Sequence, residues 1–391
     1  MPLDFLAVKQ QIKEIVAGAP AELARLQALR QKAGELLEHN AEEQEALRAK
    51  VELAAAQDSW LRSAKPTTEA LTHSFPRPPA PDGATLIAAD GSQISPSRHE
   101  AVNYFLINVG AITMLPGSGQ APETLTRSQL HFAEYTATGS LSEEQVGLER
   151  DKAERVLLAE LAAAASANPV ITLTDGPLEL WGGRSRDVEE QSHFQQSLVD
   201  YLKALEELHS LGGITAGYVD KPRADLVVRA LEIAMTEQDK LGDIRKLRPL
   251  RGVTDNDLFK GRLGPGERSA LFAIQSHLAP KYAGPLGLHF FYLNVGSAEK
   301  PWLARVELPA WVAEDAPQLD ALHASLLAQC EVLGGLRYPY ALHRAHEIAV
   351  VIREEKEQVT QMLLAELQAQ GIESSGPSQK QAAKDLEGRR R

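Results

Sequence analysis

The hydrophobic pattern divides the chain into an N-terminal helical part and a longer part in which strands and helices alternate. In residues 1–80, apolar side chains recur at spacings typical of one helical face, with charged residues between them: Leu23, Leu26, Leu29, Leu36, Leu37, Leu47, Val51 and Leu53. Pro20 suits the first turn of a second helix, after a break at residues 18–19. We therefore expect a helical hairpin or coiled-coil arm, used for packing or dimerisation.

From residue 84 the pattern changes to short apolar runs of strand length. Three strands are predicted at residues 85–89, 104–109 and 130–135, followed by a helix over 141–167. Ser142 and Gln145 fit a capping box at the start of that helix. Further strands are predicted at 170–174 and 214–219, each followed by a helix, at 187–210 and up to about 237. Strands joined by helical crossovers run parallel, whereas three sequential strands can form an antiparallel meander. The predicted fold class is α/β, with a mixed five-stranded sheet and helices on both faces.

The remaining segments predict an extension of this sheet domain. Residues 240–285 predict a loop-rich insertion, 289–295 and 302–308 predict a strand hairpin, and two helices follow at 316–332 and 341–369. Five prolines, from Pro66 to Pro81, predict a linker that neither a helix nor a central strand can hold. The expected organisation is a helical arm (1–80), one α/β domain (84–370) and a disordered tail (371–391).

Composition narrows the class of protein. A length of 391 residues is typical of two to three domains, and 41 basic against 53 acidic side chains give a formal charge of −12. By itself that charge argues against a nucleic-acid partner. The single cysteine, Cys330, excludes an intramolecular disulfide and a cysteine-based zinc cluster. Without a long apolar run or a secretory signal, we expect a cytoplasmic protein with no membrane span.

Two aspartates each follow an apolar strand and precede a glycine. Asp90 and Asp175 would lie at the strand ends, where open α/β sheets bind ligands. Two carboxylates so close together are costly without a cation, and carboxylates suit Mg²⁺ or Mn²⁺. Alternatively, Asp-Gly is simply a common turn dipeptide. One acid of the intervening helix could complete a three-carboxylate site, but spacing does not choose among Glu143, Glu144, Glu149, Asp151, Glu154 and Glu160.

Histidines and basic residues add two further candidate features. His343 and His346 share one face of a helix, where either could bind a metal or shuttle a proton. Residues 244–251 hold four basic residues and no acid, with more basic residues on both sides, whereas 306–336 hold five acids and no Lys or Arg. The net charge therefore hides a segregation of charge. The motifs of P-loop ATPases, dinucleotide-binding folds and α/β-hydrolases are absent from the sequence.

Five short motifs together resemble the NurA nucleases. They are Ala89-Asp-Gly-Ser92, Thr174-Asp-Gly-Pro-Leu178, Gly266-Glu-Arg-Ser-Ala-Leu-Phe272, Arg305-Val-Glu-Leu-Pro309, and Tyr338-Pro-Tyr with Ala345-His346. The resemblance spans about residues 84–352. It implies a ribonuclease-H-like fold and a manganese-dependent (or magnesium-dependent) nuclease with 5′–3′ exonuclease and single-strand endonuclease activity. The family acts on DNA ends in recombination-linked repair, forms dimers, and works with the hexameric ATPase HerA.

The resemblance also implies site residues. Asp90 and Asp175 match the two aspartates of the family, and His346 matches the histidine of its closing motif. The family has an Arg four positions before its glutamate, which favours Glu154 after Arg150, with Glu149 as the alternative. These four groups would be catalytic and would bind one or two divalent ions, which activate a water and stabilise the leaving 3′ oxygen. Lys221 could contact the scissile phosphate, and the other DNA-binding candidates are Arg245, Lys246, Arg248, Arg251 and Arg268.

Two other function classes compete with the nuclease. An actin- or hexokinase-like ATPase also places Asp-Gly turns on phosphates, but it needs two duplicated domains and glycine-rich adenosine loops, and the sequence indicates one copy. A non-catalytic repair scaffold would keep the sheet as a relic and use the helical hairpin to recruit a partner. If the protein is a nuclease, its net negative charge and the small group of basic residues in 221–262 predict that it binds DNA weakly by itself. We also expect the affinity to fall steeply as the salt concentration rises.

Overall fold

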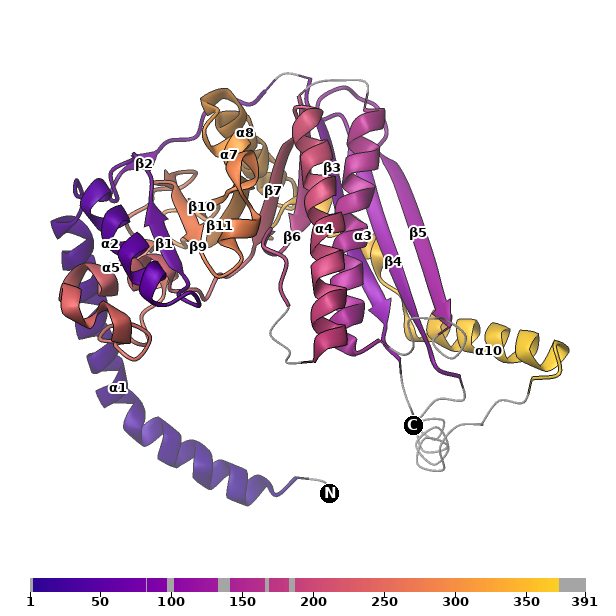
Figure 1. Ribbon diagram of the computed structural model, residues 1–391, viewed down its shortest axis with the longest axis horizontal. Coiled ribbons are helices and arrows are strands. Elements are labelled where there is room, and N and C mark those ends of the chain that lie inside the picture. Colours follow the sequence, from indigo (N-terminus) through magenta and orange to yellow (C-terminus); the bar gives the residue numbers. More distant parts are fainter. Residues whose placement is uncertain are drawn as a thin grey trace. The chain divides into compact units, whose positions relative to one another are not determined.

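The computed structural model describes residues 3–81, 83–96, 102–132, 141–165, 169–182 and 187–372. The chain forms two compact units (Figure 1). The N-terminal unit contains Met1–Pro78 and Val219–Ala313, and the C-terminal unit contains Pro79–Tyr218 and Glu314–Arg391. Residues 1–80, expected as an arm of their own, thus share a unit with part of the expected α/β domain. The reason is local packing, because α2 (Gln44–Gln57) contacts α5 (Leu226–Met235).

The C-terminal unit is built on five strands in the order β7–β6–β3–β4–β5. Their bounds are β3 (Thr85–Ile94), β4 (Tyr104–Met114), β5 (Glu123–Phe132), β6 (Val170–Asp175) and β7 (Ile214–Val219). Strands β3, β4 and β5 form an antiparallel meander, whereas β6 pairs in parallel with both β3 and β7. The predicted mixed α/β sheet is confirmed. The third strand begins earlier than expected, and residues 133–135 of the prediction lie outside the described residues.

Helices cover both faces of this sheet. In Figure 1, α3 (Glu143–Ala164) and α4 (Val188–Ser210) lie side by side along it. Ser142 caps α3 through the predicted box, since its Oγ accepts from the Gln145 backbone N–H at 3.3 Å and its own N–H donates to Gln145 Oε1 at 2.7 Å. The opposite face is covered by α9 (Tyr340–Ala349), and α8 (Ala316–Val332) precedes it.

The register decides which side chains face which helices. Asp90 of β3 lies opposite Gly110 of β4, and side chains alternate between the two faces along each strand. Gly110 lies directly under α9, whereas Gly91 lies under α3. Asp90 therefore projects to the α9 face and the neighbouring position 91 to the α3 face.

The predicted helix over 341–369 is wrong in one respect, because two helices occupy this range. The first, α9, ends at Ala349, and α10 (Arg353–Ala369) begins after an extended Ile352. The Glu355 carboxylate accepts the Ile352 backbone N–H at 2.9 Å, which caps the new helix. The predicted tail from residue 373 lies outside the described residues.

The N-terminal unit holds the first two helices and a further set of strands. Its strand order is β1–β9–β10–β11, and the predicted hairpin is confirmed as the antiparallel pair β10 and β11. The expected loop-rich insertion also holds short strands and a short helix. The elements of this unit are α1 (Phe5–His39), α2, β1 (Ser63–Pro66), β2 (Ser74–Phe75), α5, α6 (Asp255–Phe259), β8 (Arg268–Ser269), β9 (Phe272–Gln275), β10 (Leu288–Asn294), β11 (Leu303–Pro309) and α7 (Ala310–Ala313).

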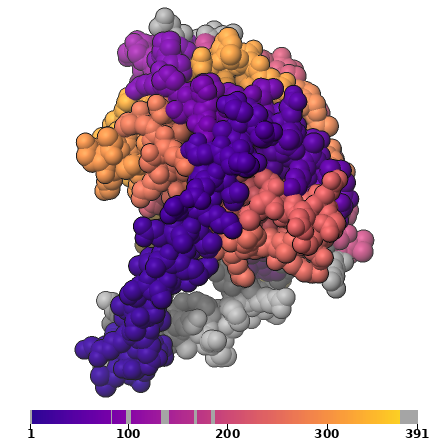
Figure 2. Space-filling model, turned by 90° about the vertical axis from the view of Figure 1, so that its left-hand side faces the viewer, coloured from indigo at the N-terminus to yellow at the C-terminus, as the bar shows by residue number. Residues whose placement is uncertain are grey.

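Two prolines behave differently from the sequence expectation. The predicted break at residues 18–19 is wrong, because α1 is one continuous helix with Pro20 inside it. Alanine and leucine, strong helix formers, surround Pro20 and offset the hydrogen bond that it cannot donate. Pro66, expected in a linker, ends the edge strand β1, where a missing N–H is tolerated. Figure 2 shows the indigo rod of α1 leaving the other residues of its unit, with Leu6 83% exposed.

Candidate active site

Asp90 and His346 meet on the α9 face of the sheet, although 256 residues separate them in the chain. His346 Nδ1 lies 2.7 Å from Asp90 Oδ2, and the Asp90 side chain is 14% exposed whereas that of His346 is 63% exposed. The second Asp90 oxygen accepts the Gly91 backbone N–H at 2.9 Å. An ionised carboxylate only accepts hydrogen bonds, so Nδ1 carries the proton and Nε2 stays available.

The position of His346 follows from how α9 is fixed to the sheet. A Cβ at Gly110 would lie 2.5 Å from the Ala349 backbone nitrogen, so the helix rests directly on the strand. The Ala349 carbonyl at the end of α9 accepts from Ser92 Oγ at 2.5 Å and from Asn108 Nδ2 at 2.7 Å. These two side chains satisfy a carbonyl that a helix end leaves unpaired, and they hold α9 in register with β3.

Glu154 approaches β3 from the α3 face. Its Oε1 lies 2.6 Å from where a Cβ of Gly91 would be, so the absent side chain makes room for the carboxylate. Glu154 is buried, and Arg150 Nε lies 3.5 Å from its Oε1. Burial raises the pKa of Glu154 well above its ordinary value, and the charges of Asp151 and Asp90 raise it further. The charges of Arg150 and Arg155 lower the pKa of Glu154, but they do not offset its burial.

Asp175 ends β6, the strand beside β3. Ala89 pairs with Thr174, so the next residues along the two parallel strands are Asp90 and Asp175, on the same face. Thr174 faces the opposite way, where its Oγ1 accepts from Arg155 Nη2 at 3.0 Å. Asp90 and Asp175 therefore occupy neighbouring positions of adjacent strands on one face, where His346 contacts Asp90. The expected turn after Asp90 is wrong, because β3 continues to Ile94 and Asp90 pairs within it with Gly110. Glu154 lies on the opposite face, where the charge of Asp90 raises its pKa.

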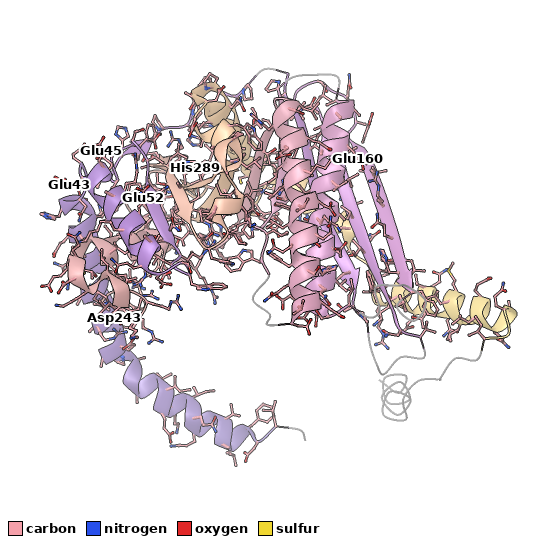
Figure 3. All side chains as sticks on the ribbon, in the orientation of Figure 1. Glu43, Glu45, Glu52, Glu160, Asp243 and His289 are labelled. Atoms are coloured by element: carbon pink, nitrogen blue, oxygen red, sulfur yellow. The ribbon has the colours of Figure 1, made fainter. Side chains whose placement is uncertain are left out.

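The alternative glutamate occupies a different environment. Glu149 Oε1 accepts from Ser197 Oγ at 2.9 Å and lies 3.1 Å from His193 Nε2, and its Oε2 lies 2.6 Å from Lys152 Nζ. These partners lie on α3 and α4, away from β3. Glu160, further along α3 (Figure 3), pairs with Arg127 of β5 at 2.6 Å. Of the helix acids, Glu154 and Asp151 are the ones whose pKa responds to Asp90.

Comparison with protein-family models shows the family of the chain. The model of the NurA domain matches residues 84–351, more than half of the chain. The chain belongs to the NurA family. It is therefore a NurA-family nuclease, as the sequence resemblance implied. Comparison with curated proteins gives no match.

Solved structures of NurA are similar at low identity. A crystal structure of NurA is 11% identical, covers 74% of this chain and 90% of its own, and superposes with a TM-score of 0.43. A structure of NurA with manganese is 13% identical over 75% and 91% of the two chains, with a TM-score of 0.37. Human ENDOV is 11% identical over 68% and 83%, with a TM-score of 0.30. The match to the family model, rather than these distant likenesses, identifies the chain.

The DNA-binding candidates of this NurA chain fall into two groups. Lys221 and Arg251 are exposed, and Lys221 Nζ lies 4.6 Å from the ring centroid of Trp302. The Asp220 carboxylate accepts the indole N–H of Trp302 at 2.8 Å, which fixes that ring beneath the lysine. Lys221 also has a positive φ of 46°, a conformation that non-glycine residues adopt rarely.

The other four candidates are paired with acids inside the N-terminal unit. Arg245 pairs with Asp58, Lys246 with Asp243 at 2.8 Å (Figure 3), and Arg248 with Asp225 and Glu232. Arg268 is 4% exposed, lies over the ring of Phe75 and pairs with Glu69 at 3.0 Å. Its burial leaves Arg268 no surface for DNA, so we do not retain it as a candidate. A basic cluster in the sequence is thus largely neutralised in the fold.

The residues that position the site were not among the predicted site residues. Helix α9 is held against the sheet by Ser92, Asn108 and Gly110, and α3 is held by Arg155. A usable signal was present in one case. Asn108 and Gly110 interrupt an otherwise apolar strand, and glycine in a strand often marks a close backbone approach.

The donor set suits a divalent cation. Carboxylate oxygens and an imidazole are the ligands that Mn²⁺ and Mg²⁺ accept, and the raised pKa of Glu154 shows that a positive charge would stabilise its ionised form. Within the described ranges, however, no three or more His, Cys, Asp or Glu side chains lie together so that they could hold a metal ion. The described helices also include none long and apolar enough to cross a membrane.

Proposed function

We propose that this NurA-family protein is a manganese-dependent (or magnesium-dependent) deoxyribonuclease. It would hydrolyse phosphodiester bonds with 5′–3′ exonuclease and single-strand endonuclease activity. The observation that supports this most directly is the 2.7 Å contact between His346 Nδ1 and Asp90 Oδ2, formed on the face where Asp175 occupies the neighbouring strand position. A manganese-bound NurA structure and one bound to dAMP and manganese are consistent with this proposal.

Asp90, Asp175, Glu154 and His346 are the residues that would hold the metal. A bound divalent ion supplies Lewis acidity and lowers the pKa of water. The chain itself supplies the remaining chemistry. Asp90 accepts a hydrogen bond from His346 Nδ1–H, which leaves Nε2 for one of two roles. In the neutral ring Nε2 would hold the ion, whereas in the doubly protonated ring it would carry a second proton and give it to the departing 3′ oxygen. Arg155 ties α3 to β6 through Thr174, and the burial of Glu154 keeps bulk water from its carboxylate.

The proposed biological setting rests on family membership. We propose that the protein acts in DNA end resection and double-strand break repair, as a homodimer, with a HerA-type hexameric ATPase, in the cytoplasm. The paired state of Arg245, Lys246 and Arg248 supports a need for such a partner. The acids paired with these cations compete with DNA phosphates, so we expect the protein alone to bind DNA weakly.

The test is cleavage of linear single-stranded DNA labelled at the 5′ or 3′ end, with Mn²⁺, Mg²⁺ or Ca²⁺. We expect wild-type protein to cut with Mn²⁺ or Mg²⁺, and Asp90→Asn and His346→Ala to lose activity while remaining folded by circular dichroism. An Asp90→Asn variant that cuts at the wild-type rate would disprove the assignment. Order of product release from the two labels reports the polarity.

A second candidate is a non-catalytic repair scaffold. It is favoured by the lack of a closed metal-ligand group among the described residues. If wild-type protein fails to cut with any ion, and calorimetry detects no Mn²⁺ binding that Asp90→Asn removes, the scaffold is the better description.

A further inference from the structure

The described part of the loop after Asp175, residues 176–182, is held at both of its ends. At its start, the Gly176 backbone N–H donates to the Tyr218 carbonyl at 2.8 Å. Two residues later, the Leu178 carbonyl accepts from the Tyr201 hydroxyl at 2.9 Å. The same hydroxyl accepts from Arg155 at 3.1 Å, so the loop is tied to both α3 and α4.

The far end of the loop is held by packing. Leu178 and Leu180 are 0% and 2% exposed. Gly182 has a φ of 149°, and the ring of Phe194 from α4 comes within 2.8 Å of the position a Cβ would take there. A buried leucine and a closely packed glycine therefore stand on either side of the residue between them.

That residue is Trp181, and its side chain is 47% exposed. Most exposed apolar side chains move freely, but this one emerges from a loop whose backbone is anchored on both sides. It lies six positions after Asp175, which limits the distance between their Cα atoms to roughly 20 Å. Trp181 is thus a fixed aromatic surface within a few nucleotides of the candidate cleavage site.

We propose that Trp181 forms a stacking subsite for one base of single-stranded DNA next to the cleavage site. The inference rests on the proposed function and adds a substrate preference to it. An indole face stacks on any base, because every base has a π-face, so the subsite is tolerant of sequence. Bases of an intact duplex are already stacked on each other and cannot use it. Trp181 therefore selects single strands and frayed ends.

The test compares three variants of the full-length protein. Binding of fluorescein-labelled oligo-dT is followed by anisotropy with EDTA, so that no cleavage occurs. We expect Trp181→Ala to raise the Kd on the order of tenfold, and Trp181→Phe, which keeps a ring, to stay within about threefold. Trp60→Ala is the matched control, because Trp60 is 49% exposed and belongs to the N-terminal unit. It should leave the Kd unchanged.

A base-free oligonucleotide separates stacking from other effects. Wild-type protein should bind the abasic strand about as weakly as Trp181→Ala binds oligo-dT. In the cleavage assay, Trp181→Ala should raise KM about tenfold and change kcat by less than about threefold. Unchanged affinity in Trp181→Ala, an equal loss in Trp60→Ala, or an equal loss for duplex DNA would each overturn the subsite. If wild-type protein binds through Trp181 but never cuts, the nuclease proposal fails and the subsite stands.

Discussion

Glu149 and Glu154 lie on one helix and differ in what surrounds their carboxylates. Glu149 has three polar partners within 3.1 Å, whereas Glu154 is buried against Gly91 with like charges nearby. A carboxylate that is already satisfied has little to gain from a cation. One that is buried among acids has much to gain, and this difference supports Glu154 as the proposed third carboxylate.

Replacement of Glu154 should separate stability from activity. A raised pKa means that the fold disfavours the ionised form, so Glu154→Gln removes a cost near neutral pH and should raise the Tm by about 1–3 °C. Cleavage should fall on the order of 100-fold. The matched variant Glu149→Gln should cut within about threefold of wild type and melt slightly lower. The reverse pattern in the two variants would show that Glu149 is the active residue.

Basic residues of the 244–251 cluster should differ in their effect on stability. Arg248→Ala leaves the fully buried Glu232 with one arginine fewer, so the free energy of unfolding should fall by about 2 kcal/mol. Lys246 is 83% exposed, and Lys246→Ala should change it by less than about 0.5 kcal/mol. Urea unfolding measures both. Equal effects in the two variants would contradict the inference that Arg248 offsets the buried charge of Glu232.

At the scale of elements, the site depends on how closely α9 approaches β4. The helix backbone rests on Gly110, and its last carbonyl is held by Ser92 and Asn108. The break after Ala349 belongs to the same arrangement, because a helix continuing past it would lose these contacts. His346, one turn earlier, is therefore positioned by polar contacts of two strands rather than by its own neighbours in sequence.

A methyl group under α9 should disturb the site. The Cβ of Gly110→Ala would meet helix backbone at 2.5 and 2.8 Å, so α9 must move. We expect about 2 kcal/mol lower stability and at least about tenfold slower cleavage, because His346 leaves Asp90.

Gly147→Ala is the matched control for Gly110→Ala. Gly147 lies inside α3, and its added Cβ would meet its nearest neighbour at an ordinary 3.7 Å. A helix gains about 0.5–1 kcal/mol from this change, and cleavage should stay at the wild-type rate. Activity that survives in Gly110→Ala would show that the close approach does not position His346.

At the scale of the whole molecule, each unit carries buried charge. In the N-terminal unit, Asp255 is fully buried and accepts from the Val227 and Val228 backbone N–H groups and from the Tyr292 hydroxyl at 2.7 Å. Burial raises the pKa of Asp255 to about 6, and these hydrogen bonds only partly offset it. The net charge of −12 thus includes acids that the fold, rather than solvent, accommodates.

The stability of the protein should depend on Asp255 between about pH 4 and pH 6. The folded pKa is above the unfolded one, so the protonated form stabilises the fold, and that contribution is lost as pH rises through about 6. Measured by urea unfolding, the stability of wild type relative to Asp255→Asn should fall by roughly 2–3 kcal/mol from pH 4 to pH 7. A difference that stays constant with pH would contradict the raised pKa.

The sequence by itself determined the order of strands and helices, because apolar runs and helical periodicity depend on neighbouring residues. It also placed Asp175 at the end of its strand, but it ended the first strand at Asp90, whereas β3 continues to Ile94. It could not choose between Glu149 and Glu154, show that acids pair with most cations of 244–251, or show that Trp181 is exposed on a packed loop. Only the tertiary structure decided these points, because burial, pairing and close approach depend on residues far apart in the chain, such as Asp90 and His346, 256 positions apart.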